Sequence, residues 1–257
     1  MINDWELIQT NLSRMENRQI EVAVLPIGAI EPHNRHLPYG QDMLHSTEVA
    51  RRCVKKAWQE TKKVLLLPTI PYGVDCNLMD FPFAMHVRQS TLDALVGDLV
   101  GSLRKFGVRK IVILNGHGGN EFKGLIRQLQ CDLDVHLFLI NWWQVGEDQY
   151  DEIFELPDDH AGELETSVAM HLYPQWVELE KAGDGLSKDF RFEALNKGWV
   201  TTSRNFGKVN DHCAVGNPAK ATPEKGEKYL NLVCDRISRF LIELANSPLD
   251  ADFPFAH

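Results

Sequence analysis

The chain has 257 residues, of which 44% are hydrophobic and 25% charged, a balance typical of a globular protein with a substantial core. The net charge of −9 argues against nucleic-acid binding, and no stretch has the roughly 18 apolar residues of a membrane span. The five scattered cysteines lack CxxC spacing and the start lacks the pattern of a signal peptide, so we expect a reducing, cytoplasmic setting.

Apolar segments alternate with amphipathic segments along the first part of the chain. The predicted strands, rich in β-branched residues, cover residues 20–28, 63–70, 109–114 and 135–141. The predicted helices cover residues 47–62, 90–106 and 122–130. In the helix over 90–106 we expect Ser90 as N-cap and a buried stripe of Leu92, Leu95, Leu99 and Leu103. This alternation predicts a parallel sheet covered by helices on both faces.

The pattern loosens beyond Trp143. Residues 163–172 are predicted as a helix, and residues 183–215 as irregular and polar. A long last helix, up to about residue 245, is predicted to follow Thr222 as N-cap, with Pro223 as its first residue. Because no flexible linker, repeat or low-complexity tract interrupts the chain, we expect a single domain over residues 1–257.

A first cluster of possible metal ligands directly follows the strand over 20–28. It contains Glu31, His33, His36, Asp42 and His45, in a segment that Pro32, Pro38 and Gly40 are expected to bend. Imidazole and carboxylate groups at the end of a strand favour a divalent-metal site over incidental structural histidines. His36 is expected to line the pocket or support a ligand, and His45 to cap the helix or lie on the surface.

A second cluster, Asn115–Asn120, follows the strand over 109–114 and contains His117 between glycines. The glycines allow a tight fold round an ion or an oxyanion. The alternative is a glycine-rich turn with an incidental histidine. Neither a dinucleotide GxGxxG motif nor a P-loop fits the spacing, which leaves phosphate binding as the weaker reading.

The third cluster, residues 158–167, precedes the helix over 163–172. One interpretation is that Asp158 or Asp159 caps that helix. The other is that Asp159 orients His160 and makes it a proton carrier. Glu163 and Glu165 lie about 200° apart on a helix, so only one of them can face a shared site.

These segments resemble the motifs of the creatininase (creatinine amidohydrolase) family. The resemblance covers residues 25–42, 115–120, 160–167 and 215–226, in family order. It implies a three-layer α/β/α enzyme with two divalent metal ions, often a hexamer.

The resemblance also implies a ligand set. Glu31, Asp42 and His117 would hold one metal, and His33 and Asp42 the other, with Asp42 bridging. Gly119 stands where creatininases carry a glutamate ligand, so we expect Glu165 to complete the second site in place of that residue; Glu163 is the alternative.

The expected activity is hydrolysis of a non-peptide C–N bond in a small amide, with a cyclic amide favoured. Two ions of zinc, manganese or iron would activate a bridging water. The backbone amides of Gly118 and Gly119 would stabilise the oxyanion, and His160, oriented by Asp159, would protonate the leaving nitrogen.

Gly118 replaces the aromatic residue of creatininases, which disfavours creatinine itself, and Trp143 is expected in the substrate pocket together with His36. The alternatives are a formamide hydrolase, a peptidase for small peptides, or a metal-dependent binder without turnover. We expect a homo-oligomer, and no nucleic-acid or membrane partner.

Overall fold

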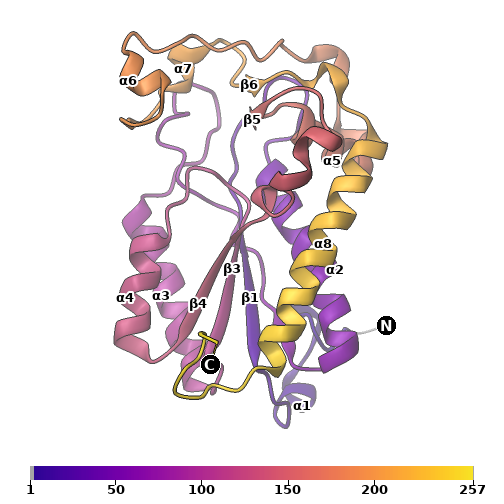
Figure 1. The fold of residues 1–257 in the computed structure, drawn as a ribbon, viewed down its shortest axis with the longest axis vertical. Helices are drawn as coiled ribbons and strands as arrows, with labels where there is room; N and C mark the ends of the chain where they lie inside the picture. The colour runs from indigo at the N-terminus through magenta and orange to yellow at the C-terminus, as the bar shows by residue number, and fades with distance from the viewer. Residues whose placement is uncertain (1–2, 257) are drawn as a thin grey trace.

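A parallel four-stranded sheet forms the centre of the computed structural model. The structure describes residues 3–256. The predicted domain also included Met1, Ile2 and His257, which lie outside the described residues. The strands stand in the order β2–β1–β3–β4 (Figure 1). Their bounds are β1 Val22–Ile27, β2 Val64–Leu66, β3 Lys110–Asn115 and β4 His136–Asn141. Strand β1 pairs with β3 from Val22↔Lys110 to Ile27↔Asn115, so both strands end at the same edge.

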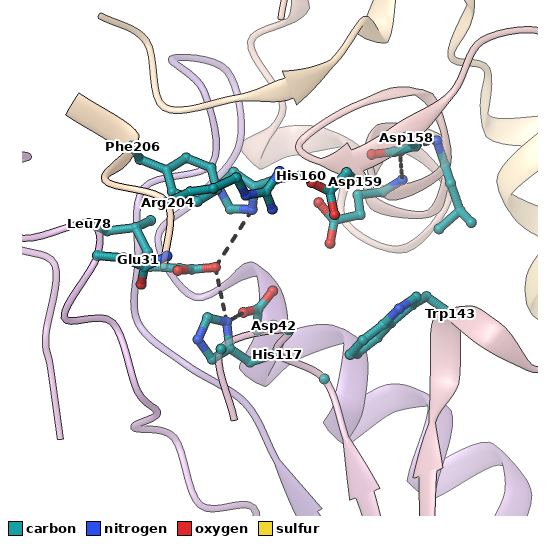
Figure 2. A pocket seen from close by; sticks show the side chains of 16 residues that line it. Glu31, Asp42, Leu78, His117, Trp143, Asp158, Asp159, His160, Arg204 and Phe206 are labelled. Carbon is teal, nitrogen blue, oxygen red and sulfur yellow. Dashed lines mark hydrogen bonds and ion pairs between the residues drawn. The ribbon is translucent and has the colours of Figure 1, made fainter. Parts of the chain in front are cut away.

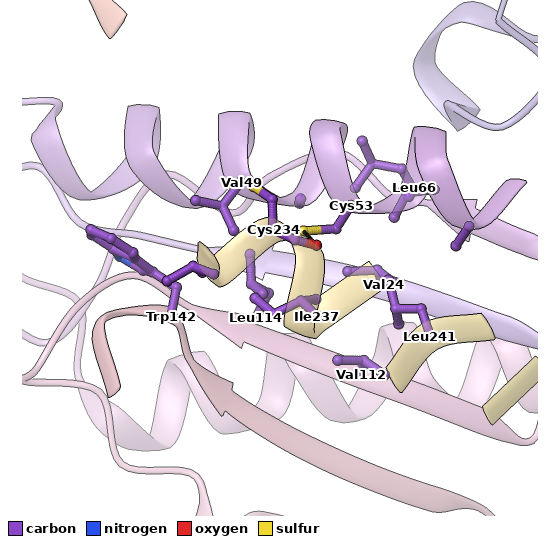
Figure 3. Packing of buried hydrophobic residues seen from close by; sticks show 14 of the residues in the cluster. Val24, Val49, Cys53, Leu66, Val112, Leu114, Trp142, Cys234, Ile237 and Leu241 are labelled. Atoms are coloured by element: carbon purple, nitrogen blue, oxygen red, sulfur yellow. Dashed lines mark hydrogen bonds between the residues drawn. The ribbon is translucent and has the colours of Figure 1, made fainter. Parts of the chain in front are cut away.

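Helices cover both faces of the sheet, which confirms the predicted three-layer α/β/α fold. Helices α2 (Gln41–Thr61) and α8 (Pro223–Asn246) lie on one face, and α3 (Gln89–Lys105) and α4 (Lys123–Leu133) on the other (Figure 1). All six residues of β1 are buried, as expected for a strand covered on both faces. Figure 3 shows Val24, Cys53 and Ile237 packed between the sheet, α2 and α8.

Helix α2 begins at Gln41, six residues before the predicted start, and this difference shapes the site. A Cβ on Gly28 would lie only 2.4 Å from the nitrogen of Met43, so glycine at the end of β1 lets the first turn of α2 approach. Asp42 and His45 are therefore buried in the first turns of a helix that faces the sheet edge.

Two details of the prediction for α3 are wrong. The N-cap is Arg88, whose side chain makes no capping hydrogen bond, and Ser90 lies inside the helix. The fully buried face consists of Leu92, Val96 and Val100, whereas Leu95 is 44% exposed. The helix turns its i, i+4, i+8 row, Leu92, Val96 and Val100, towards the sheet, and Leu99 and Leu103 are only partly buried beside it.

The second half of the chain builds a wall beside the sheet edge. Helix α5 (Glu163–Leu172) has the predicted bounds and packs against α8, and β5 (Asp158–His160) pairs antiparallel with β6 (Val215–Gly216). Thr222 caps α8 as predicted, because its side chain accepts a hydrogen bond from the backbone nitrogen of Lys225.

Short helical segments complete the fold. The α-helical ones are α1 Leu12–Met15, α6 Glu193–Asn196 and α7 Phe206–Val209. The 3-10 segments are η1 Leu7–Gln9, η2 Trp142–Gln144, η3 Glu147–Glu152, η4 Pro174–Trp176, η5 Leu179–Lys181 and η6 Pro218–Lys220. Among the described residues, none of the helices combines the length and apolar character needed to cross a bilayer.

Candidate metal centre

Asp42 lies between two histidines that come from different parts of the chain. Its Oδ1 is 3.0 Å from Nε2 of His33, and its Oδ2 is 2.9 Å from Nδ1 of His117. All three side chains are buried. Each carboxylate oxygen thus faces a different imidazole, which is the arrangement of a carboxylate shared by two binding positions. Figure 2 shows Asp42 and His117 on the floor of the cavity.

Two glutamates complete this arrangement. Glu31 Oε1 lies 3.2 Å from Nδ1 of His117, and Glu165 Oε2 lies 3.8 Å from Nε2 of His33. The donor atoms of Glu31, Asp42 and His117 lie within 4.8 Å of one another, and so do those of His33, Asp42 and Glu165. The structure therefore brings together the two ligand sets that the sequence resemblance implied.

Glu163 does not reach this cluster. Its Oε2 accepts hydrogen bonds from the backbone nitrogens of Glu155 and Leu156, and its Oε1 lies 2.5 Å from Nζ of Lys225. The two glutamates project to different sides of α5, so the geometry favours Glu165 over Glu163.

The polar side chains of the second motif hold His117 in place. Asn115 donates to the carbonyl of His117 and accepts from its backbone nitrogen, while Asn120 accepts from the nitrogen of Val74. A Cβ on Gly119 would lie 2.3 Å from Nε2 of His117, whereas a Cβ on Gly118 would meet nothing within 4 Å. A glutamate at 119 is therefore incompatible with this loop, and the third carboxylate of the two ligand sets, Glu165, comes from α5.

Without a metal ion, the cluster needs bound protons to offset its charges. Burial raises the pKa of Glu31 and of Glu165 to about 8. Burial disfavours charge on Asp42 and His33 as well, but their mutual attraction is stronger: it holds the pKa of Asp42 far below its usual value and raises that of His33 to about 10. Glu31 Oε2 and His33 Nε2 are buried without a well-formed hydrogen bond. A carboxylate- and imidazole-rich cluster that needs protons to offset its charges fits divalent cations, which would displace those protons.

Asp75 is a site residue that the sequence analysis missed. It is fully buried, and its Oδ1 lies 3.1 Å from Nε2 of His117, at the same distance as the carbonyl oxygen of Val74. The carbonyl oxygen of Val74 accepts the hydrogen bond from Nε2, and the carboxylate of Asp75 adds negative charge beside it, so the proton stays on Nε2 and Nδ1 is left to face Glu31 and Asp42. The signal in the sequence was that Asp75, like Glu31, follows a predicted strand towards the same sheet edge.

His160 reaches the cluster, but not through the predicted partner. Its Nε2 lies 3.0 Å from the carbonyl oxygen of Pro32, which places the proton on Nε2, and its Nδ1 lies 3.7 Å from Glu31 Oε1. Burial, aided by the charge on His33, lowers the pKa of His160 to about 3. The imidazole is thus neutral, with a lone pair on Nδ1 directed towards the cluster.

The expected pairing of Asp159 with His160 is wrong. Asp159 Oδ2 instead lies 2.5 Å from Nη1 of Arg204, and its side chain is 53% exposed. Asp158, by contrast, accepts hydrogen bonds from the nitrogens of Gly162 and Leu164, so the capping interpretation holds for that residue.

A cavity of about 240 Å³ opens over the cluster. Gly118, Gly119 and Trp143 line it, where the prediction put them, whereas Trp142 is 1% exposed in the core. Arg204 and Phe206 also line it, from the irregular segment that carried no periodic signal. The described residues make no hydrogen bond to the backbone nitrogens of Gly118 and Gly119.

Two histidines of the first cluster lie away from the cavity. His36 Nε2 is 2.8 Å from Oγ1 of Thr166, so the predicted place of His36 in the pocket is wrong. His45 packs its ring edge against Trp142 and is 1% exposed, so it neither caps the helix nor lies on the surface. Both side chains support the helices that carry the acidic residues.

A comparison with known families matches residues 6–241 to the creatininase model, described as creatinine amidohydrolase. The chain belongs to the creatininase family. This confirms the family that the four motifs suggested.

Individual relatives differ in what they act on. Creatinine amidohydrolase of Pseudomonas putida is 28% identical over 183 residues, which cover 63% of this chain and 68% of that protein. The mycofactocin precursor peptide peptidase of Mycobacterium ulcerans is 27% identical over 226 residues, 84% of this chain and 83% of the relative. A candidate creatinine amidohydrolase from Bacteroides fragilis has a crystal structure that is 37% identical, with a TM-score of 0.90 over 97% of this chain and 100% of the other.

Proposed function

We propose that the protein is a metal-dependent amidohydrolase that cleaves a non-peptide C–N bond in a small amide. The observation that carries this proposal is Asp42, whose two oxygens lie 3.0 Å and 2.9 Å from two different histidines. Such a shared carboxylate suits two divalent ions, for which zinc, manganese and iron match the mixed nitrogen and oxygen donors. When bound, these ions would supply an activated water and polarise the amide carbonyl.

We propose Glu31, Asp42 and His117 as the ligands of one ion, and His33, Asp42 and Glu165 as those of the other. The loop of Gly118 and Gly119 then provides two backbone N–H groups beside the cluster. Since the described residues leave both groups without a partner, they are available to the substrate's carbonyl oxygen as it gains negative charge.

His160 is proposed as the proton carrier, with its role modified by its tautomer. Its Nδ1 has a lone pair, so it first accepts a proton from the attacking water and then returns that proton to the leaving nitrogen. The carbonyl of Pro32, rather than a carboxylate, holds the ring in this orientation. Asp159 has no part in this proton transfer.

A peptidase is the second candidate, because a relative that covers 84% of this chain is a precursor peptide peptidase. The cavity volume of about 240 Å³ favours the smaller substrate, since pockets for drug-sized ligands measure roughly 300–1,000 Å³. A small cyclic amide or a formamide fits that volume better than an extended peptide.

We further infer that the protein works in the cytoplasm as a homo-oligomer of a single domain. Five free cysteines support a reducing compartment. Exposed large apolar side chains, such as Phe83 (81%) and Trp199 (74%), support contacts between copies of the chain. Light scattering coupled to size-exclusion chromatography measures the mass and tests the oligomer directly.

The test of the activity uses protein stripped by a chelator and reloaded with zinc, manganese or iron. It is assayed on a panel of cyclic ureas, lactams and formamides. We expect hydrolysis of at least one class to return with metal, and Asp42→Asn to abolish it. Replacing His160 with Gln should lower turnover ~10²–10⁴-fold at unchanged metal content. Two bound ions without turnover on any of these amides would favour a binding protein instead.

A further inference from the structure

Arg204 is the one lysine or arginine among the described residues that line the cavity. It lies in the irregular segment between α6 and α7, and the proposed hydrolysis assigns it no role. The other titratable side chains in the lining are carboxyl groups, among them Glu31, Asp42 and Glu165, and the imidazoles of His117 and His160. We therefore ask why a cationic guanidinium lines a cavity that is otherwise rich in carboxyl groups.

Two contacts brace this side chain, and one of its partners also packs against His160. Its Cζ lies 5.3 Å from the centre of the Phe206 ring, and Phe206 is 4% exposed and packs edge-on against His160 at 5.1 Å. Nη1 of Arg204 lies 2.5 Å from Asp159 Oδ2 on the other side. Figure 2 shows Arg204 and Phe206 beside His160, above Glu31. The guanidinium is therefore placed next to the proposed proton carrier.

The bracing leaves most of the hydrogen-bonding capacity of Arg204 unused. A guanidinium carries five N–H donors, and among the described residues Asp159 is the only acceptor recorded for it. The side chain of Asp159 is 53% exposed and that of Arg204 34% exposed, so water weakens their ion pair. The remaining donors form a planar fork at the cavity wall, which suits a carboxylate or a phosphate.

We propose that the substrate is a small amide that carries an anionic group, and that Arg204 binds this group while the amide lies at the Asp42 cluster. This inference rests on the proposed function. Carboxylate and phosphate share the chemistry that a guanidinium recognises, and the spacing between anion and amide is set by the distance from Arg204 to the cluster. Arg204 is on this account a specificity-determining residue.

Hydroxamates test the inference without knowledge of the substrate, because a hydroxamate binds a divalent metal in place of the amide. The probes are neutral acetohydroxamate, the monohydroxamates of malonic, succinic and glutaric acid, and 3-phosphonopropionohydroxamate. Dissociation constants are measured by titration calorimetry on the zinc-loaded protein. We expect at least one anionic probe to bind ten-fold or more tightly than acetohydroxamate, and the phosphonate distinguishes the two kinds of anion.

The variants separate anion binding from bracing. In Arg204→Gln the anionic probe should bind no more than about two-fold more tightly than acetohydroxamate, while the dissociation constant of acetohydroxamate stays unchanged. Asp159→Asn removes the ion pair but keeps the guanidinium, so it should retain the advantage. If Arg204 only held the segment between α6 and α7 in place, both variants would weaken the binding of all probes to the same extent, and that result would overturn the inference.

The outcomes also separate this inference from the proposed function. If acetohydroxamate binds and no anionic probe binds more tightly, the anionic substrate is wrong and the metal centre stands. If the protein retains no zinc after loading and removal of the excess, the metal centre fails and the inference fails with it.

Discussion

At the scale of single residues, Asp42 gains its position from glycine and from helix geometry. Gly28 lets the first turn of α2 approach the end of β1, so that a carboxylate in that turn reaches both His33 and His117. Burial of such a group is costly unless charge or hydrogen bonds offset it. The surrounding histidines offset it partly, and we assign the remainder to divalent cations.

Asp75 offers a test of how His117 is oriented. In Asp75→Asn the carboxylate that faces Nε2 of His117 is lost, so the ring is held less firmly in the tautomer that presents Nδ1. We expect metal affinity to fall ~10–100-fold, as for other carboxylates that support a ligand histidine. Competition with a chromophoric chelator measures it. Asp98→Asn, at an exposed position of α3, is the control and should bind metal as the wild type does; an equal result for both variants would contradict the assignment.

The two neighbouring glycines give a matched pair of variants. Gly119→Ala places a methyl group 2.3 Å from Nε2 of His117, so the loop must shift and metal affinity should fall roughly ten-fold or more, as when a ligand loses its support. Gly118→Ala adds the same methyl group in open space and should leave metal affinity unchanged. Equal affinities for the two variants, measured by calorimetric zinc titration, would show that the loop is not constrained as described.

The ligand residues could be predicted from sequence because they are reactive types at strand ends. Glu31, His33 and His117 stand directly after apolar runs, and the sheet brings those ends together. Side-chain partners that meet only through the tertiary fold could not be predicted in this way. The sequence does not show whether Asp159 pairs with His160 or with Arg204, because the contact with Arg204 depends on how residues 183–215 fold back.

At the scale of elements, strands β1, β3 and β4 and the last helix followed their sequence signals closely. Strand β2 is shorter than predicted, Val64–Leu66 against residues 63–70, and α3 differs in the face that it buries. Leucines recur at 92, 95, 99 and 103, but the helix buries Leu92, Val96 and Val100. Two apolar rows were present in the sequence, and contact with the sheet selected one of them. Propensity alone cannot decide that rotation.

The helix caps give a test at this scale. Thr222→Ala removes the hydrogen bond to the nitrogen of Lys225 at the start of α8 and should lower the free energy of unfolding by about 1 kcal/mol. Ser90→Ala is the control, because Ser90 lies within α3 and makes no capping bond. Urea titrations of both variants measure the difference; a loss in Ser90→Ala as large as in Thr222→Ala would contradict these assignments.

At the scale of the whole molecule, stability should depend on pH through buried neutral histidines. Burial lowers the pKa of His45 to about 3, from an ordinary value of 6.5. Below pH 6.5 the unfolded chain therefore binds a proton that the native chain does not, and stability is lost as the pH falls towards 3. Above pH 6.5 this histidine has no effect.

His45→Gln isolates this contribution, because glutamine does not titrate. Relative to the variant, metal-free wild type should lose about 1.4 kcal/mol of unfolding free energy per pH unit between pH 6 and 4. Denaturant titrations at several pH values measure the two curves. The substitution also changes packing, which shifts the unfolding free energy by the same amount at every pH and does not affect the test. If the curves of wild type and variant are parallel over the whole pH range, the lowered pKa of His45 is wrong.

The three-layer fold could be predicted at this scale because strand and helix periods alternate clearly. The cavity could not, since its lining is drawn from β-strand ends, α5 and the irregular segment with Arg204 and Phe206. Only the folded chain shows that the irregular segment closes one side of the cavity.

The most direct measurement of the central claim is anomalous X-ray scattering from crystals of the zinc-loaded protein. We predict two peaks ~3.5–4 Å apart on either side of Asp42, one beside Glu31 and His117 and the other beside His33 and Glu165. A single peak, or peaks that do not contact Asp42, would contradict the shared centre on which the proposed hydrolysis rests.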